Sequence, residues 1–162
     1  MAHCDGGDPE ESLSARRRET RTTARLALFD SRGRILLFLH ADGMGRKFWA
    51  TPGGGIEEGE SPEQAARREA AEELGAPDVD LTYLWTGLTE FEFADKDVSQ
   101  TEAFFRVAGH PATFGPEVEA THRRERILEN RWWSAEEIEA STERILPLDL
   151  AKRVREFGGR PL

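Results

Sequence analysis

Three glutamates between residues 69 and 73 are spaced so that they could bind one metal ion together. Glu69, Glu72 and Glu73 fall at positions i, i+3 and i+4, and a helix that turns by about 100° per residue places all three on one face. Carboxylate oxygens are the ligands that Mg²⁺, Mn²⁺ and Ca²⁺ prefer. The cluster therefore indicates a divalent-cation site, although a glutamate-rich stretch is more often a solvated helix face and acids alone decide nothing.

The residues around the cluster predict a helix over residues 62–74. Ser61 is a favourable N-cap, and Gln64 completes a Ser-x-x-Gln capping box with it. Gly75 lies where a glycine commonly ends a helix. The face opposite the glutamates carries small apolar residues, which would let the helix pack closely against a sheet.

The wider spacing resembles the Nudix box of the MutT/Nudix family. Seven identities of that box are present, namely Gly54, Glu60, Arg68, Glu69, Glu72, Glu73 and Gly75. A chance match of this kind has a probability of roughly 10⁻⁴ over the whole chain. Two variable positions, Ala70 and Ala76, carry smaller apolar residues than the family usually has. The preceding segment Trp49-x-x-Pro52-Gly53-Gly54-Gly55 also resembles family members.

The resemblance implies a fold and an activity. Nudix proteins have an α/β (α+β) fold, an α/β/α sandwich with a mixed β-sheet, in which the box forms a loop–helix–loop. They use Mg²⁺ or Mn²⁺ to hydrolyse a nucleoside diphosphate linked to another moiety X. Divalent ions suit this pyrophosphatase chemistry because they activate water and neutralise charge on the phosphate oxygens. The implied partner is a small nucleotide-type substrate.

Carried over position by position, the resemblance assigns roles to the charged residues of the helix. Glu69, Glu72 and Glu73 would bind the metal, and Glu69 would also be the general base or position that base. Arg68 would orient the carboxylates, and Gly75 would end the helix. The implied catalytic group is therefore one arginine and three glutamates, with Mg²⁺ or Mn²⁺ as cofactor.

Residues outside the helix would complete the site. A backbone carbonyl of Gly53 or Gly54 would add a metal ligand, and Glu60 would brace the loop against the helix. Family members often use a further acid from a loop before the last strand. Four acids compete for that role: Glu117, Glu119, Glu125 and Glu129. We favour Glu125 because it lies just before the predicted strand 127–133.

Two other functions remain as alternatives. Some Nudix-fold proteins bind nucleotides as sensors without turnover, although a pure binder need not keep like charges together. An isoprenoid-diphosphate isomerase would use the same box, but that enzyme type relies on a cysteine. The single cysteine of this chain, Cys4, falls in the predicted tail, which disfavours the isomerase. The sequence shows no signature for one particular nucleotide.

Composition and charge limit the partners. The chain has 162 residues, with 22 Lys+Arg and 31 Asp+Glu and a net charge of −9, which disfavours nucleic acid and anionic membranes because both would repel it. No apolar stretch approaches the roughly 20 residues that span a bilayer, and the first residues lack the apolar core of a secretory signal. We therefore expect a cytoplasmic protein. A homodimer is an option because it is common among relatives.

The rest of the sequence predicts a disordered tail at residues 1–18 and a single mixed domain at 19–160. Segments 20–30 and 35–39 indicate a hairpin joined by a turn. Further strands are predicted at 79–88, 89–93, 102–107 and 127–133, and further helices at 135–140 and 147–157.

Residues 52–55 and 110–120 are rich in glycine or proline and predict loops. The aromatic residues Phe48, Trp49, Trp132 and Trp133 could stack on a base, but we favour core positions for them. The histidines His40, His110 and His122 are expected at the surface or in loops. The arginines Arg123, Arg124 and Arg126 could hold phosphates, but a solvated basic turn is the commoner case.

Overall fold

The computed structural model describes residues 16–110 and 113–159 of the chain. Within them, the elements in chain order are β1 (Arg17–Ala27), β2 (Ile35–Ala41), β3 (Lys47–Ala50), β4 (Gly53–Gly55), α1 (Pro62–Leu74), β5 (Asp80–Phe93), β6 (Lys96–Ala108), α2 (Pro116–Arg124), β7 (Ile127–Trp133), α3 (Ala135–Ala140) and α4 (Leu150–Phe157).

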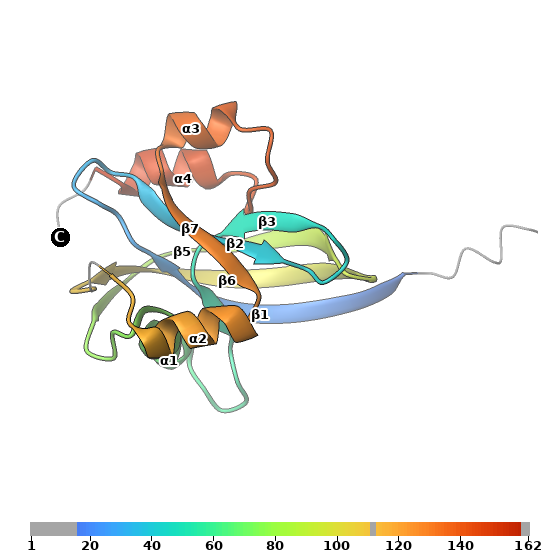
Figure 1. Cartoon of the computed structure of the whole chain (residues 1–162), viewed down its shortest axis with the longest axis horizontal. Helices are drawn as coiled ribbons and strands as arrows, with labels where there is room; N and C mark the ends of the chain where they lie inside the picture. Colours follow the sequence, from blue (N-terminus) through green and yellow to red (C-terminus); the bar gives the residue numbers. More distant parts are fainter. Residues whose placement is uncertain (1–15, 111–112, 160–162) are drawn as a thin grey trace, which may run out of the picture.

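The strands form two sheets (Figure 1). The larger sheet has the order β4-β1-β6-β5, and the smaller has the order β3-β2-β7. Strands β1 and β6 run parallel, whereas the other neighbouring pairs are antiparallel. The larger sheet is therefore mixed, as the resemblance implied.

Helices cover the sheets on two sides, with α1 and α2 below the strands in Figure 1 and α3 and α4 above them. On the lower side, Ala66 and Ala70 of α1 are fully buried in a cluster that includes Phe105 of β6. On the upper side, Val154 of α4 packs in a cluster with Trp133 of β7. The predicted α/β/α sandwich is confirmed.

Helix α1 has the predicted bounds because both of its ends are capped. The Gln64 amide donates to Ser61 Oγ at 3.1 Å, and the Ser61 amide donates to Gln64 Oε1 at 2.8 Å, which satisfies two amides that the helix leaves without partners. Gly75 ends the helix in the left-handed conformation, with φ of 65°. Both caps fix where the glutamates of the helix lie.

The predicted hairpin of segments 20–30 and 35–39 is wrong. A turn does join β1 to β2, and Phe29 forms an isolated bridge with Ile35, but the two strands then diverge into different sheets. Strand β1 pairs instead with β4 and with β6. The turn residues decide only local geometry, whereas the partners of β1 come from distant parts of the chain.

Two predicted loops contain regular structure. Residues 53–55 form β4, which pairs with β1 through backbone groups that need no side chains. The segment 110–120 was predicted as a loop because of its Gly and Pro, yet α2 begins within it. Gly115 is the N-cap and Pro116 the first helical residue, a position that proline tolerates because its missing N–H has no helical partner there.

Other boundaries shift by a few residues. Strand β1 begins at Arg17, so residues 17 and 18 belong to the sheet and not to the predicted tail; residues 1–15 lie outside the described residues. The runs 79–88 and 89–93 are one strand, β5, and β6 begins at Lys96. Helix α4 begins at Leu150, three residues after Pro147. Strand β7 and helix α3 have the predicted bounds.

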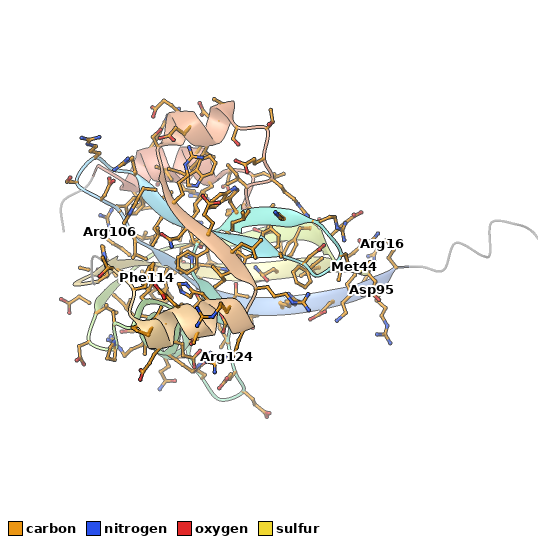
Figure 2. The ribbon with its side chains drawn as sticks, viewed as in Figure 1. Arg16, Met44, Asp95, Arg106, Phe114 and Arg124 are labelled. Carbon is orange, nitrogen blue, oxygen red and sulfur yellow. The ribbon has the colours of Figure 1, made fainter. Side chains whose placement is uncertain are left out.

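One end of the two sheets is tied by Arg46. Its guanidinium binds Glu92 at 3.0 Å and the Ala94 carbonyl, so the loop after β2 is joined to the turn between β5 and β6. Figure 2 labels Met44 and Asp95 at this end of the molecule. The tie holds the smaller sheet against the larger one beside the cleft described below.

Candidate active site

Two of the three predicted metal-binding glutamates face inwards from α1. Glu69 and Glu73 are only 6% and 2% exposed, whereas the Glu72 side chain is 47% exposed. Both inward carboxylates meet β4. The Gly53 amide donates to Glu73 Oε2 at 2.8 Å, and Glu69 Oε1 lies against Gly54. The structure thus brings two of the glutamates together at the glycine strand and leaves the third at the helix surface.

The glycines of β4 make this approach possible. A Cβ atom at Gly54 would lie 2.3 Å from Glu69 Oε1, and a Cβ atom at Gly53 would lie 2.2 Å from the Ala24 carbonyl oxygen. Gly53 also has a φ of +139°, a value that L side chains rarely adopt. A Cβ atom at Gly55 would meet nothing within 4 Å. The close contact therefore constrains the first two glycines and not the third.

Arg68 joins the charged residues of the box into one network. It makes two hydrogen bonds to Glu60 and one to Glu69 Oε1, all at 2.9 Å. It also donates to the Gly55 carbonyl at 2.8 Å and lies 3.6 Å from Glu72 Oε2. Hydrogen bonding to Arg68 lowers the pKa of Glu60 to about 2. One planar guanidinium thus links the loop, the glycine strand and the helix.

The inward carboxylates lack enough positive charge to balance them. Burial raises the pKa of Glu69, and its contacts with Arg68 oppose that rise only in part. Burial also raises the pKa of Glu73 well above its ordinary value, and a hydrogen bond with Glu125 raises it further. Carboxyl groups that resist ionisation in a protein become a favourable site once a cation balances them.

Glu125 is the acid outside the helix that reaches this cluster. It is the C-cap residue of α2, and its carboxylate faces that of Glu73. All four acids considered for this role are exposed, and Glu125 differs from Glu117, Glu119 and Glu129 by its contact with Glu73. The position of Glu125 agrees with our preference among the four, while its role stays a prediction.

Helix α2 is held against the end of α1 by His122. The buried imidazole donates from Nε2 to the Glu73 carbonyl at 2.7 Å, and its ring packs against Phe114 at 5.2 Å. The absence of a side chain at Gly75 also lets α2 lie close to the end of α1, because a Cβ atom at Gly75 would lie 2.9 Å from Val118. The expected surface position of His122 is therefore wrong, and its lack of ligand-like spacing in the sequence concealed this packing role.

The donor set fits a hard divalent cation. Glu69 and Glu73, with Glu125 opposite, present carboxylate oxygens beside the backbone of Gly53 and Gly54. In the described part of the chain, no group of three or more His, Cys, Asp or Glu side chains is arranged so that it could hold a metal ion by itself. Mg²⁺ commonly binds through one or two carboxylates and completes its shell with water and substrate phosphate, so a partial set of this kind suits it.

A cleft between the two sheets opens beside this cluster. It has a volume of about 190 Å³, and Gly53, Glu73 and Glu125 line one part of it. The remaining lining comes from strands of both sheets and from the segment before α4: Arg21, Arg25, His40, Phe48, Ala50, Thr89, Phe91, Phe93, Gln100, Glu102 and Leu146. We call it the inter-sheet cleft. None of these remaining residues was predicted as a site residue.

The other predicted residues have mixed outcomes. Trp133 is buried and Trp132 only partly so, and Phe48 and Trp49 are also buried, in agreement with core positions. His40 is wrongly expected at the surface, because it lies in β2 and lines the inter-sheet cleft. The arginines considered for phosphate binding are exposed at and after the end of α2: Arg123, Arg124 and Arg126. Figure 2 labels Arg124 on that helix.

The chain is similar to a family model and to a curated protein. A family model described as the NUDIX domain matches residues 9–157. A curated protein of Teredinibacter turnerae, described as an RNA pyrophosphohydrolase, is 38% identical over 79 residues, which cover 48% of this chain and 45% of that protein. The match thus spans about half the length of this curated relative.

Solved structures share the fold at low sequence identity. The MutT protein from Methanosarcina mazei Go1 has a TM-score of 0.59 and 19% identity, over 88% of this chain and 98% of that one. The E. coli dihydroneopterin triphosphate pyrophosphohydrolase has a TM-score of 0.58 and 20% identity, over 84% and 93%. Among the described residues, no helix is long and apolar enough to cross a membrane.

Proposed function

This chain belongs to the NUDIX family, and on that premise we propose that it is a Mg²⁺- or Mn²⁺-dependent hydrolase that cleaves a phosphoanhydride bond. Its substrate is a nucleoside diphosphate linked to another moiety X. The observation that carries the proposal is the pair of buried glutamates, Glu69 and Glu73, packed against a glycine strand with too little positive charge around them. Two similar proteins named above are pyrophosphohydrolases by description, which supports the same bond type.

The residues that would hold the metal ion are Glu69 and Glu73, assisted by Glu125 and by a carbonyl of Gly53 or Gly54. Glu72 would bind from the exposed rim of the helix, where its side chain can turn towards the substrate phosphates. When bound, a divalent ion supplies Lewis-acid stabilisation of phosphate charge and lowers the pKa of water. The predicted cytoplasmic location and homodimer remain predictions.

Glu69 is our candidate for the general base. Its Oε1 atom is held by Arg68, so Oε2 is the oxygen that can take a proton from the attacking water. Burial raises the pKa of this carboxyl group, and a carboxylate with a raised pKa is a stronger base than an exposed one. Arg68 keeps the carboxylate in place while the proton moves, because it is anchored at the same time to Glu60 and to the Gly55 carbonyl.

The test combines product identification with charge-neutral variants. We would incubate the protein and Mg²⁺ or Mn²⁺ with a panel of nucleoside-diphosphate compounds and identify the products by mass. We expect Glu73→Gln and Glu72→Gln to lose most of the activity while the fold stays intact. Glu63→Gln is the matched control, because Glu63 lies in the exposed first turn of the same helix and should keep full activity.

Each outcome has a definite meaning. Turnover of one class of compound that is lost in Glu73→Gln supports both the activity and the metal site. Full activity in both Glu73→Gln and Glu72→Gln would remove the metal assignment. Saturable stabilisation of the protein by a nucleotide, with no product under either metal, would instead favour a sensor that binds without turnover.

A further inference from the structure

A buried ion pair lies beside the point where the chain crosses from the smaller sheet to the larger one. Arg25 of β1 and Glu102 of β6 form it, with Nε and Oε1 3.2 Å apart and side chains that are only 13% and 6% exposed. The interior elsewhere is built from apolar residues, such as Ala27, Leu37 and Trp133. A buried ion pair costs desolvation free energy that well-packed apolar side chains of similar volume do not cost. The pair therefore needs an explanation other than core stability.

Glu102 is fixed by two further hydrogen bonds. Its Oε2 atom accepts from Thr89 Oγ1 at 2.6 Å, and its Oε1 atom also accepts from Gln100 Nε2 at 2.6 Å. With Arg25, the donors come from three strands, β1, β5 and β6. Hydrogen bonds to a buried carboxylate are strong because the surrounding dielectric is low. Glu102 is thus a rigid anchor that holds the Arg25 side chain in one direction.

The other end of the Arg25 guanidinium holds the crossing between the sheets. Residues 51 and 52 connect β3 of the smaller sheet to β4 of the larger sheet. Arg25 Nη1 donates to the Thr51 carbonyl at 3.2 Å, and the Leu26 amide donates to the Pro52 carbonyl at 2.8 Å. Thr51 is only 1% exposed, so water has little access to replace the arginine as donor. Two neighbouring residues of β1 therefore hold both residues of the crossing.

Strand β4 needs such support because it has no side chains of its own. It consists of three glycines and pairs with residues 23–25 of β1. Glycine loses more conformational freedom on folding than any other residue. The backbone of Gly53 lies directly on β1, since a Cβ atom there would be 2.9 Å from Arg25 Cα. The position of β4 thus depends on contacts made at its start, where Arg25 lies.

The start of β4 is also where the sheet contacts the candidate metal site, because the Gly53 amide donates to Glu73 Oε2 at 2.8 Å. The Thr51 carbonyl belongs to the planar peptide group before Pro52, and the Gly53 amide belongs to the planar group after it. The proline ring fixes φ between these two groups, so that only ψ of Pro52 can change their relative orientation. A guanidinium that holds the Thr51 carbonyl therefore limits the directions in which the Gly53 amide can point.

We propose that Arg25 is a positioning residue of the candidate active site. By holding the Thr51 carbonyl, it aims the Gly53 amide at Glu73 and keeps that carboxylate in place to bind the cation. The inference rests on the proposed function and deepens it, because it gives a role in metal binding to a residue outside the helix and the glycine strand. The hydrogen bonds of Arg25 go to Glu102 and to the Thr51 carbonyl, so Arg25 acts through the backbone.

The test uses a background in which Arg25 can be removed without leaving a buried charge. Arg25→Met alone would leave Glu102 buried and ionised without its cation, a change that is strongly destabilising. Glu102→Gln keeps the shape of the side chain and an oxygen that can accept from Arg25. We would therefore compare Glu102→Gln with the double variant Glu102→Gln/Arg25→Met. Residue 102 is uncharged in both proteins, so the difference between them reports Arg25.

Two measurements follow the proposed series of contacts. Hydrogen exchange by NMR in metal-free buffer reports the protection of the Gly53 amide, and calorimetric titration with Mg²⁺ reports the affinity of the site. We expect the double variant to exchange the Gly53 amide faster, and to bind Mg²⁺ more weakly, by about threefold to tenfold each, as loss of one hydrogen bond implies. Glu102→Gln alone should bind Mg²⁺ as the native protein does.

Two more variants in the Glu102→Gln background show whether the effect is specific to Arg25. Arg21→Met is the matched control, because Arg21 lies four residues earlier on β1 and lines the same cleft, but its guanidinium binds Glu19 at 2.8 Å. It should leave both measured values within about twofold. Arg25→Lys returns a donor without the planar guanidinium, so it should recover part of both losses.

Three results would overturn the proposal. Unchanged exchange of the Gly53 amide in the double variant would show that the crossing keeps its position without Arg25. Faster exchange with unchanged Mg²⁺ affinity would leave Arg25 a structural role alone. A raised KM with unchanged Mg²⁺ affinity would make Arg25 a substrate contact. Absence of Mg²⁺ and Mn²⁺ binding in the native protein is a separate result, which would reject the proposed function itself and with it any role of Arg25 in metal binding.

Discussion

Two buried carboxylates that line the inter-sheet cleft, Glu102 and Glu73, have different kinds of hydrogen-bond partner. Glu102 on β6 accepts three side-chain hydrogen bonds, one of them from a guanidinium. Glu73 on α1 is equally buried, yet it accepts a backbone amide of Gly53 and faces another carboxyl group, that of Glu125. Burial alone therefore does not distinguish the two sites; the partners of each carboxylate do.

The difference separates two tasks. A carboxylate whose oxygens are already occupied is a rigid part of the protein, and it can orient its neighbours, as Glu102 orients Gln100. A buried carboxylate without a balancing positive charge raises the free energy of the metal-free folded protein. Binding of a cation beside it removes this cost, so the folded protein favours the cation. Glu73 on the helix is thus the carboxylate suited to bind a cation, whereas Glu102 is a fixed part of the sheet.

The largest effect is expected at Gly54 of β4, which Glu69 of α1 contacts. Gly54→Ala places a Cβ atom 2.3 Å from Glu69 Oε1, so the carboxylate must move. Displacement of a reacting group by about 1 Å can cost about a hundredfold in rate, and we expect a loss of that size in kcat/KM. Steady-state kinetics on the substrate found by the product screen would measure it.

Gly55→Ala is the control for this change. It adds the same methyl group one residue later, where nothing lies within 4 Å, and should leave kcat/KM within about threefold, as expected for a site free of steric conflict. Equal losses in the two variants would show that β4 tolerates no side chain in general. In that case the contact between Gly54 and Glu69 would not be the cause.

The second prediction concerns the sign of a stability change. In metal-free buffer at neutral pH, Glu73→Gln should stabilise the protein by about 1–3 kcal/mol, since it removes a buried carboxyl group whose negative charge no cation balances. Glu102→Gln should destabilise it by about 1–3 kcal/mol, since it leaves Arg25 unpaired. Denaturant unfolding of each variant beside the native protein would test this. If both variants change the free energy of unfolding in the same direction, the proposed contrast between Glu73 and Glu102 is wrong.

The pH dependence of the Glu73 effect follows from its raised pKa. A carboxyl group whose pKa is higher in the folded state binds its proton more tightly there, so it stabilises the fold at low pH and loses that contribution as pH rises. The advantage of Glu73→Gln should therefore grow from pH 4.5 upwards, through the raised pKa. Acids that do not interact with Glu73 cancel in the difference, whereas Glu69 and Glu125 contribute through their interaction with it. A difference independent of pH would contradict the raised pKa.

Mg²⁺ should reduce the stability advantage that Glu73→Gln has over the native protein in metal-free buffer. Addition of Mg²⁺ is expected to raise the melting temperature of the native protein more than that of Glu73→Gln, because ligands stabilise the state that binds them. Thermal unfolding with and without Mg²⁺ measures both values. The same shift in the two proteins would place the cation elsewhere, and Glu102→Gln should respond as the native protein does.

The sequence reveals the helix cluster but not the cleft, for a physical reason. The groups of the cluster come from one short segment, so their spacing along a capped helix determines which of them share a face. The polar lining of the inter-sheet cleft comes from Arg25 on β1, Thr89 on β5, and Gln100 and Glu102 on β6. The spacing of residues along any one strand does not show which residues of the neighbouring strands lie beside them. Gln100 and Glu102 do alternate as polar residues along β6, but such alternation ordinarily marks a face towards water.

Helix α2 shows a second limit of sequence analysis. Gly115 and Pro116 are typical of loops as well as of helix starts, and the context that chooses between them is the packing of His122 and Val118 against the end of α1. Without α2, Glu125 could be chosen only because it precedes a strand. The structure adds the reason that it lies near Glu73.

The smallest predicted effect tests whether the contact of His122 with α1 matters for activity. His122→Leu keeps an apolar side chain in the buried position but removes the donor to the Glu73 carbonyl. Loss of one hydrogen bond is worth about 0.5–1.5 kcal/mol, so we expect kcat/KM to fall by about threefold to tenfold and more Mg²⁺ to be needed for activity. His122→Gln retains an N–H donor and should recover part of the loss.

A double-mutant cycle decides whether His122 acts through Glu125. If α2 serves to hold Glu125 beside Glu73, then His122→Leu should cost little in a protein that already carries Glu125→Gln, because residues that act on one another are not additive. If the two losses in kcat/KM multiply fully, then His122 supports only the end of α1. The helix cluster would then depend on α1 and β4 alone, without help from the second helix.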